Sequence, residues 1–391
     1  MRDGRNNNMG QLFLREIKLI AGNHSLLLTL LLAPLFYVFF YGTIYSYKVE
    51  EKVVLAVADD DRSEMSRMFV EQMNNMQVVS VLRASSLEAA QERMYRGEAQ
   101  GYFYIPKGMQ SKVLSLQQAD VVLAVNGARF LPSSELTGAI TQLGLTIGAG
   151  VRLQYQEKMG LNSAMALQEA MPVNIDYRPL YNPQASYGGF LLPVLLVLIL
   201  QQTLLLGLSG SVALERENGE IGRLVKVGGG LSGMLYGKAA FYLLLYLAYA
   251  AFFMTVNYQV LQLPFRGSYR DLAVLLFLFV ATLIPMAVWI GTLFKSQLLA
   301  AQLMAFSTYP FFLICGYAWP FESMPPLLQG LSSLLPLTPF VKVYTSIVQT
   351  GGTLQDHAGS VIHLLLLWMF YLLMALWGLK RLNKKQQPIS L

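Results

Sequence analysis

Charged residues and cysteine are both scarce in this chain. Of its 391 residues, 13% are charged and 54% are hydrophobic, and Cys315 is the single cysteine. Soluble globular proteins carry about a quarter charged residues, so the low charge argues against an ordinary soluble enzyme, a disordered protein or a coiled coil. One cysteine excludes a disulfide within the chain and any multi-cysteine metal or iron–sulfur site.

Histidine is also scarce, and the chain lacks a nucleotide-binding loop. The histidines are His24, His357 and His363, and the last two are six residues apart, which does not place them on one helix face. A metal site needs several ligands, so we expect no metal site. Residues 233–238 read GMLYGK, where the glycines are one residue too close for a P-loop and Ala239 follows the lysine. The sequence therefore predicts no catalytic residue and no cofactor bound by this chain.

The few charges are spaced so that long stretches contain none. Six such stretches are residues 19–47, 179–214, 239–265, 272–294, 296–321 and 357–379. A membrane-spanning helix needs about 20 mainly apolar residues, so each stretch is a candidate span. A further stretch, residues 323–341, holds four prolines, which oppose a continuous helix. We expect a re-entrant hairpin over residues 320–345 at the outer face, buried in protein.

Basic residues gather on one side of these spans. They precede the first span, lie between the second and third, and follow the sixth: Arg2, Arg5, Arg15, Lys18, Arg216, Arg223, Lys226, Lys238, Lys380, Arg381, Lys384 and Lys385. By the positive-inside rule, the pattern predicts a multi-pass protein of the bacterial inner membrane with both termini cytoplasmic. The topology accounts for the net charge of +6, so we expect a lipid membrane and no nucleic acid as the partner.

The N-terminal segment, residues 1–24, has an amphipathic pattern. Met9, Leu12, Phe13, Ile17 and Ile20 recur at helical spacing, with basic residues between them. This pattern favours a helix lying on the inner membrane surface. The alternative is that the segment simply extends the first span, which we place at residues 25–47.

Residues 48–178 are charge-rich and form an insertion of different character. Alternating patterns predict strands over 53–57, 78–82, 101–105 and 121–125, and helices over 63–74, 86–96 and 132–158. A last strand is expected over 173–178. The run Asp59-Asp60-Asp61 is best explained as helix capping before Ser63. The fold class is therefore an α-helical polytopic membrane protein with six transmembrane helices and an inserted α/β extracytoplasmic domain, followed by a bundle over residues 187–391.

Two segments carry more specific patterns. Residues 212–224 read VALERENGEIGRL and begin where the second span reaches the cytoplasm. Alternating charges followed by glycine predict a short helix over 214–225 that can dock on a soluble partner, although composition alone favours a solvated loop. Residues 316–326 read GYAWPFESMPP, and residues 335–340 read LPLTPF; both belong to the proline-broken outer hairpin.

Together these two segments resemble the permease subunit of type-2 ABC exporters. In that family a Glu-Arg-Glu-x-Gly run follows the second span and an outer Pro-x-x-Ser-Met-Pro run precedes the last span. Further matches are Pro34, the run Tyr181-Asn182-Pro183, and Gly237-Lys238. The chain departs from the family at Glu220, where threonine is common, and at Gly228-Gly229, where a Thr-Pro pair is common.

The resemblance implies partners that the chain itself does not contain. It implies a second permease copy or a paralogue, a separate ABC ATPase subunit that binds ATP and Mg, and in some relatives a periplasmic adaptor protein. It assigns the coupling of ATPase movement to the spans to Glu215, Arg216, Glu217, Gly219, Glu220 and Arg223. It marks the outer hairpin at Pro320, Glu322, Ser323, Met324 and Pro325. The inserted domain could grip an adaptor, gate the exit or contact cargo, and sequence does not choose among these.

Polar residues in the middle of two spans are candidates for the transport path. They are Gln201, Gln202 and Thr203 in the second span and Ser307, Thr308 and Tyr309 in the fifth. Such residues face either protein or a water-filled route, and hydrogen bonding between helices is an equally good explanation. The absence of full charge in these spans favours export of an amphipathic or hydrophobic cargo such as a drug or lipid. The competing functions are a membrane-anchored sensor or assembly scaffold and, less favoured, an intramembrane enzyme.

Overall fold

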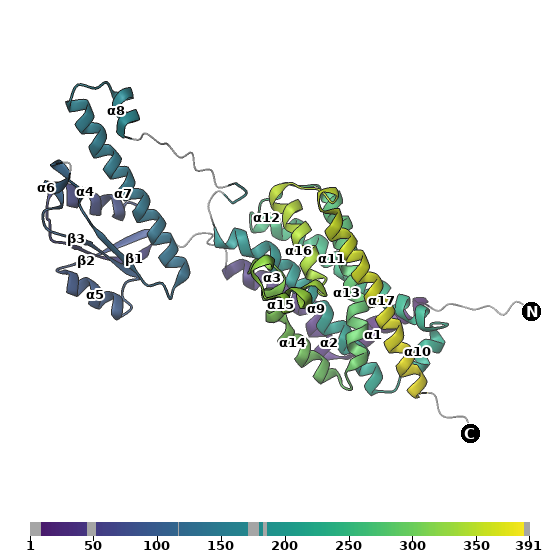
Figure 1. Cartoon of the computed structure of the whole chain (residues 1–391). Coiled ribbons are helices and arrows are strands. Elements are labelled where there is room, and N and C mark those ends of the chain that lie inside the picture. Colours follow the sequence, from purple (N-terminus) through teal and green to yellow (C-terminus); the bar gives the residue numbers. More distant parts are fainter. Residues whose placement is uncertain (1–8, 45–51, 116, 171–179, 183–185, 387–391) are drawn as a thin grey trace, which may run out of the picture. The chain divides into compact units, whose positions relative to one another are not determined.

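The computed structural model describes residues 9–44, 52–115, 117–170, 180–182 and 186–386. The chain divides into two compact units, one formed by Met1–Ser46 with Tyr187–Leu391 and the other by Tyr47–Ser186 (Figure 1). The larger unit is helical, and the smaller one contains a sheet. Each unit has its own hydrophobic core.

The larger unit contains the predicted membrane helices. Among the described residues, six helices are long and apolar enough to cross a membrane: His24–Ile44, Tyr187–Glu217, Leu231–Val260, Tyr269–Leu293, Gln297–Ile314 and Gln355–Lys385. The first comprises α2 (His24–Leu27), a π-helical turn (Leu28–Leu32) and α3 (Ala33–Ile44), and the others are built on α9 (Tyr187–Glu217), α11 (Leu231–Phe252), α13 (Tyr269–Leu293), α14 (Gln297–Ile314) and α17 (Ala358–Gln386). The prediction of a mostly helical protein with about six candidate membrane spans is confirmed, and the bent pair Pro326–Ser333 with Leu337–Thr350 would be a seventh if it crosses the membrane as one span.

Helix α9 is the centre of this unit. Its most apolar window is 89% buried, against 11% for α14 and 22% for the first span. A helix that is hydrophobic all round is buried on all sides, and α9 packs against α3, α13 and α14. The exposed faces of α14 and of the first span are apolar, as lipid-facing or partner-facing helices require.

The N-terminal helix is separate from the first span. Helix α1 (Met9–Gly22) ends before Asn23, whose backbone is extended and whose side chain accepts a hydrogen bond from the Leu26 amide. An asparagine in this conformation caps a new helix. The alternative in which this segment merely continues the first span is therefore wrong, and α1 packs instead along α11.

The helix predicted over 214–225 is two helices rather than one. Residues 214–217 form the last turn of α9, and α10 begins later and spans Ile221–Val227. Between them Gly219 has φ +70, a left-handed conformation that suits glycine. The prediction was wrong here because the charged run does not interrupt α9, which continues one turn past its apolar part.

The proline-rich segment forms a sharply bent helical pair. A 3₁₀ turn (Phe321–Ser323) precedes α15 (Pro326–Ser333), and α16 (Leu337–Thr345) leads into a π-helical turn (Ser346–Thr350). The two parts meet at 84°. Ser332 joins the pair to the end of α14, because its hydroxyl donates to the Ile314 carbonyl at 2.5 Å. This is the broken-helix geometry that the prolines predict.

The smaller unit is an α/β sandwich built on a four-stranded sheet of order β2-β1-β3-β4. Strand β1 (Val53–Asp59) pairs in parallel with β2 (Val79–Ala84) and β3 (Gly101–Ile105), and β4 (Val122–Val125) runs antiparallel to β3. Helices α4 (Glu64–Asn74) and α7 (Phe130–Lys158) cover one face, and α5 (Leu87–Tyr95) covers the other (Figure 1). The remaining helices are α6 (Met109–Leu114) and α8 (Ser163–Ala170). The strand expected over 173–178 lies outside the described residues.

The aspartate run has a different role from the predicted one. Ser63 caps α4 with its own hydroxyl, which accepts from the Ser66 amide at 3.0 Å. Asp61 instead accepts from the amides of Gly108 and Gln110 at 2.7 and 3.1 Å, at the start of α6. Slight burial would raise the pKa of Asp61, but hydrogen bonds from the Ser63 side chain and from the amides of Gln110 and Gly108 lower it. The carboxylate thus ties the end of β1 to a distant helix.

Candidate functional site

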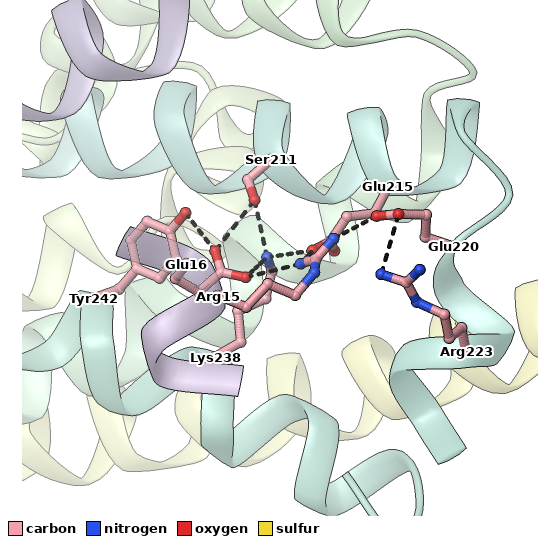
Figure 2. Close-up of polar contacts among 8 residues, drawn as sticks. All are labelled: Arg15, Glu16, Ser211, Glu215, Glu220, Arg223, Lys238 and Tyr242. Carbon is pink, nitrogen blue, oxygen red and sulfur yellow. Dashed lines mark hydrogen bonds and ion pairs between the residues drawn. The ribbon is translucent and has the colours of Figure 1, made fainter. Parts of the chain in front are cut away.

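Four charged side chains meet where α1, α9 and α11 come together. Lys238 of α11 donates from Nζ to Glu16 Oε1 at 2.7 Å, to Glu215 Oε1 at 2.9 Å and to Ser211 Oγ at 2.8 Å (Figure 2). An ammonium has three donors, and all three are used. Arg15, on α1, approaches the same Glu215 oxygen at 2.5 Å. Two cations and two carboxylates therefore form the inner part of what we call the ion cluster.

The ion cluster continues from the buried interior to the surface. Arg15 also pairs with Glu220, at the start of α10, and Glu220 Oε1 lies 3.4 Å from Arg223 Nη2 (Figure 2). Side-chain exposure rises along this path, from 4% at Lys238 to 21% at Arg15 and 69% at Arg223. The path links an exposed turn to three helices of the membrane unit.

Charge balance and hydrogen bonds at most of the polar atoms make this burial tolerable, although the second carboxylate oxygen of Glu215, Oε2, is buried with no hydrogen-bond partner among the described residues. A buried charge without a partner is costly, whereas paired charges with satisfied hydrogen bonds are accepted. Glu16 also accepts from the hydroxyls of Tyr242 and Ser211, at 3.2 and 3.4 Å. Burial raises the pKa of Glu16, and the attraction of Lys238 opposes this rise. Removing a cation would leave a buried carboxylate without its partner, and removing a carboxylate would leave a buried cation without its partner.

Sequence reasoning missed Glu16, Ser211 and Tyr242 as members of a site. A signal for Glu16 exists, because Leu12, Glu16 and Ile20 are spaced by four and share the buried face of α1. An acidic residue on an apolar helix face calls for a buried cationic partner. Close packing brings that partner near, since a Cβ on Gly237 would lie 2.9 Å from the Leu12 side chain.

The two residues after Glu215 hold a different part of the unit. Arg216 donates from Nη1 to the carbonyls of Thr292 and Phe294, at 2.8 and 2.9 Å, at the end of α13. Glu217 Oε2 accepts from the Gln297 amide at 3.1 Å, at the start of α14. The Glu-Arg-Glu run therefore joins α9 to α1, α11, α13 and α14 through three consecutive side chains.

The residues expected to couple the chain to the ATPase fall into two groups. Glu215 is 1% exposed, so its side chain is enclosed within the larger unit and is not open to a soluble partner. The reason is that Glu215 lies on the face of α9 that meets α1 and α11. Glu217, Gly219 and Arg223 are exposed, and Arg216 and Glu220 are half-buried. The exposed members form a surface at the turn between α9 and α10.

The candidate path residues are only partly brought together. Gln202, Thr203 and Thr308 line a cavity of about 240 Å³ beside Tyr37 and Tyr41 of α3. The Gln202 amide donates to the Met304 carbonyl, which is a bond between helices, whereas the Thr203 and Ser307 hydroxyls bond within their own helices. Tyr309 is 68% exposed and lies outside the lining, and Gln201 is buried with no hydrogen-bond partner among the described residues.

The outer-hairpin residues have different surroundings: one lines a cavity, one is buried, and three lie at the ends of short helical segments. Glu322 lines a cavity of about 390 Å³ together with Lys342 and His363. Met324 is buried, and its carbonyl accepts from Gln329 Nε2 at 2.9 Å. Three residues shape the backbone around them: Pro320 starts the 3₁₀ turn, Ser323 ends it and Pro325 precedes α15.

Comparison with known proteins identifies the family. The model of the family described as ABC-2 family transporter protein matches residues 24–377. The chain is 21% identical over 344 residues to "Probable multidrug ABC transporter permease YbhS" of Escherichia coli (strain K12), covering 87% of this chain and 88% of YbhS. It is 26% identical over 211 residues to "Probable multidrug ABC transporter permease YbhR" of the same organism, an alignment that spans 53% of this chain and 57% of YbhR. The chain is a multi-pass membrane protein that belongs to the ABC-2 transporter family, as a permease.

Proposed function

We propose that this chain is the membrane-spanning subunit of an ATP-driven exporter in the bacterial inner membrane, with both termini cytoplasmic. A separate ABC ATPase subunit supplies ATP hydrolysis with Mg, and a second copy of the chain or a paralogue completes the permease. Family membership supports the permease role, and the basic residues at the spans' ends support the orientation. The smaller α/β unit then lies outside the cytoplasm, where a periplasmic adaptor protein is a candidate partner.

The observation that carries the proposal is the ion cluster. An ATPase docked on the exposed turn near Glu217 and Arg223 would act on Glu220, and Glu220 is paired with Arg15. Arg15 and Lys238 then share Glu215 and Glu16, which link α9, α1 and α11. Because these ion pairs are short, a displacement of the turn between α9 and α10 would move α1, α9 and α11 with it.

The cavity beside α3, α9 and α14 supports an amphipathic or hydrophobic cargo, drug-like or lipid-like. Its lining combines apolar side chains with Gln202, Thr203 and Thr308 and includes no full charge. Its volume of about 240 Å³ is smaller than the roughly 300–1,000 Å³ typical of pockets for drug-sized ligands. A second permease against the exposed face of α14 would enlarge it.

Co-purification tests the subunit role. The tagged chain is extracted from its own host in mild detergent, and the co-purifying proteins are identified by mass spectrometry. The proposal predicts a stoichiometric P-loop ATPase. A clean chain with no ATPase, also after gentle crosslinking, would favour a sensor or assembly scaffold instead.

A further inference from the structure

The α/β unit contains a recess at the carboxyl ends of two parallel strands. Its volume is about 260 Å³, and its lining includes the end of β1, the end of β2 and the first turns of α4. Three arginines line it, Arg62, Arg67 and Arg83. In α/β sheets, the crevice outside the carboxyl strand ends is where ligands commonly bind.

The three arginines come from three different elements. Arg62 lies in the loop after β1, Arg67 in α4 and Arg83 near the end of β2. Arg83 is paired in register with Val57, so both side chains lie on the sheet face that α4 covers. Arg62 has φ +52, a left-handed conformation that arginine seldom adopts, and the Asp59 carboxylate accepts its amide at 2.9 Å.

The guanidinium groups around this recess have no ion-pair or hydrogen-bond partner among the described residues. In the part of the chain that the structure describes, none of the three is in an ion pair or a side-chain hydrogen bond, unlike Arg15 and Arg96. Asp59, the residue of the lining that carries a carboxylate, accepts hydrogen bonds from the Ser66 hydroxyl at 2.7 Å and from the Arg62 amide at 2.9 Å. The three side chains are exposed, so solvent screens their mutual repulsion, and an anion that enters the recess would meet three cations with no ion pair among the described residues.

Charge and size together indicate the anion. Three guanidinium cations and one carboxylate give the recess a formal net charge of +2. The volume of about 260 Å³ is below the range of drug-sized sites. Guanidinium groups bind phosphate through paired hydrogen bonds. Two amides in the first turn of α4 are already bonded, Met65 to Gln110 and Ser66 to Ser63, so the arginine side chains are the main candidate donors.

We propose that this recess is a binding site for a phosphate group, carried either by a free small molecule or by a lipid head group. Arg67 and Arg83 hold the phosphate oxygens from opposite sides, and Arg62 closes the site from the loop. The proposed phosphate site is separate from the ion cluster and from the cavity lined by Gln202, Thr203 and Thr308, because all of its lining residues belong to the α/β unit.

Titration calorimetry on the full chain tests the site. The chain is held in an uncharged maltoside detergent at fixed ionic strength without phosphate, and inorganic phosphate is the probe. We expect saturable binding, about tenfold weaker in Arg67→Gln and in Arg83→Gln, because each loses a charge-assisted hydrogen bond. Arg83→Lys keeps the positive charge but loses the paired donors of the guanidinium group. Its affinity for phosphate should therefore lie between that of Arg83→Gln and that of the wild type.

The matched control is Arg152→Gln, an exposed arginine of α7 outside the recess that carries the same charge change. Its binding should equal that of the wild type. Absence of saturable binding to the wild type, or equal weakening in Arg152→Gln, would overturn the proposal. A short-chain phosphatidic acid and glycerol 3-phosphate, its water-soluble counterpart, then distinguish the sources: tighter binding of the lipid assigns a lipid head group, and equal or tighter binding of glycerol 3-phosphate assigns a free small molecule.

Discussion

Replacing Lys238 with methionine should destabilise the membrane unit by about 3 kcal/mol. The change keeps the side-chain length and removes the cation whose three hydrogen bonds reach Glu16, Glu215 and Ser211. Breaking a buried ion pair by removing one partner costs about 3–5 kcal/mol. We expect the lower end of that range because Arg15 remains, at 2.5 Å from Glu215 and 3.4 Å from Glu16.

A second substitution separates charge imbalance from lost packing. Glu16→Gln added to Lys238→Met restores equal numbers of buried positive and negative charges, so the double variant should recover at least half of the lost stability. Unfolding in mixed micelles measures the free energies, and Lys226→Met, at an exposed lysine of α10, is the control. If Lys238→Met costs no more than this control, or if the double variant is no better than the single, the account of the ion cluster is refuted.

Three further predictions concern other parts of the chain. Glu217→Ala removes an exposed carboxylate that accepts from the Gln297 amide, so it should lower the stability by about 1 kcal/mol and lower ATP hydrolysis by the reconstituted complex. Glu215→Ala should lower the stability by about 3 kcal/mol because it leaves buried cations without their partner; a loss no larger than that of Glu217→Ala would contradict its burial. Gly237→Leu should push α1 off α11 through Leu12, which hydrogen exchange would detect as lost protection of residues 9–22; full protection would show that the packing is not tight. The lowered pKa of Asp61 means that its bonds to α6 stabilise the fold above about pH 3.9, its unfolded value, and are lost as the pH falls through the folded value; pepsin cleavage near residues 106–114 should therefore rise on acidification, and Asp61→Asn should remove that pH dependence.

The large-scale organisation was accessible from the sequence because hydropathy alone determines it. Six charge-free stretches correspond to six apolar helices, and the strand 101–105 has the predicted bounds. The serine cap of α5 at Ser86 could be predicted because a cap depends on residues three apart, whereas the cap of α4 was expected from the aspartates before Ser63 and is made by Ser63 itself. Such features depend on local chemistry, which a single sequence contains.

The ion cluster was less accessible because its members are far apart in the chain. Glu16 and Lys238 are 222 residues apart, and no local pattern indicates that α1 lies along α11. The same distance effect explains Asp61, whose partner helix lies 47 to 49 residues away. For Glu215, the charged run suggested an exposed position, whereas helix geometry turns this one side chain inward while Glu217, two residues later, points outward.

The most direct test of coupling compares transport with ATP hydrolysis in the reconstituted exporter carrying Glu16→Gln with Lys238→Met. This variant keeps equal numbers of buried positive and negative charges and leaves the exposed turn between α9 and α10 unchanged. It removes the Glu16–Lys238 ion pair between α1 and α11. We predict that the ATPase still binds and hydrolyses ATP while the amount of cargo moved per ATP falls at least severalfold. An unchanged ratio of transport to hydrolysis would contradict the claim that the ion cluster carries movement from the ATPase to the spans.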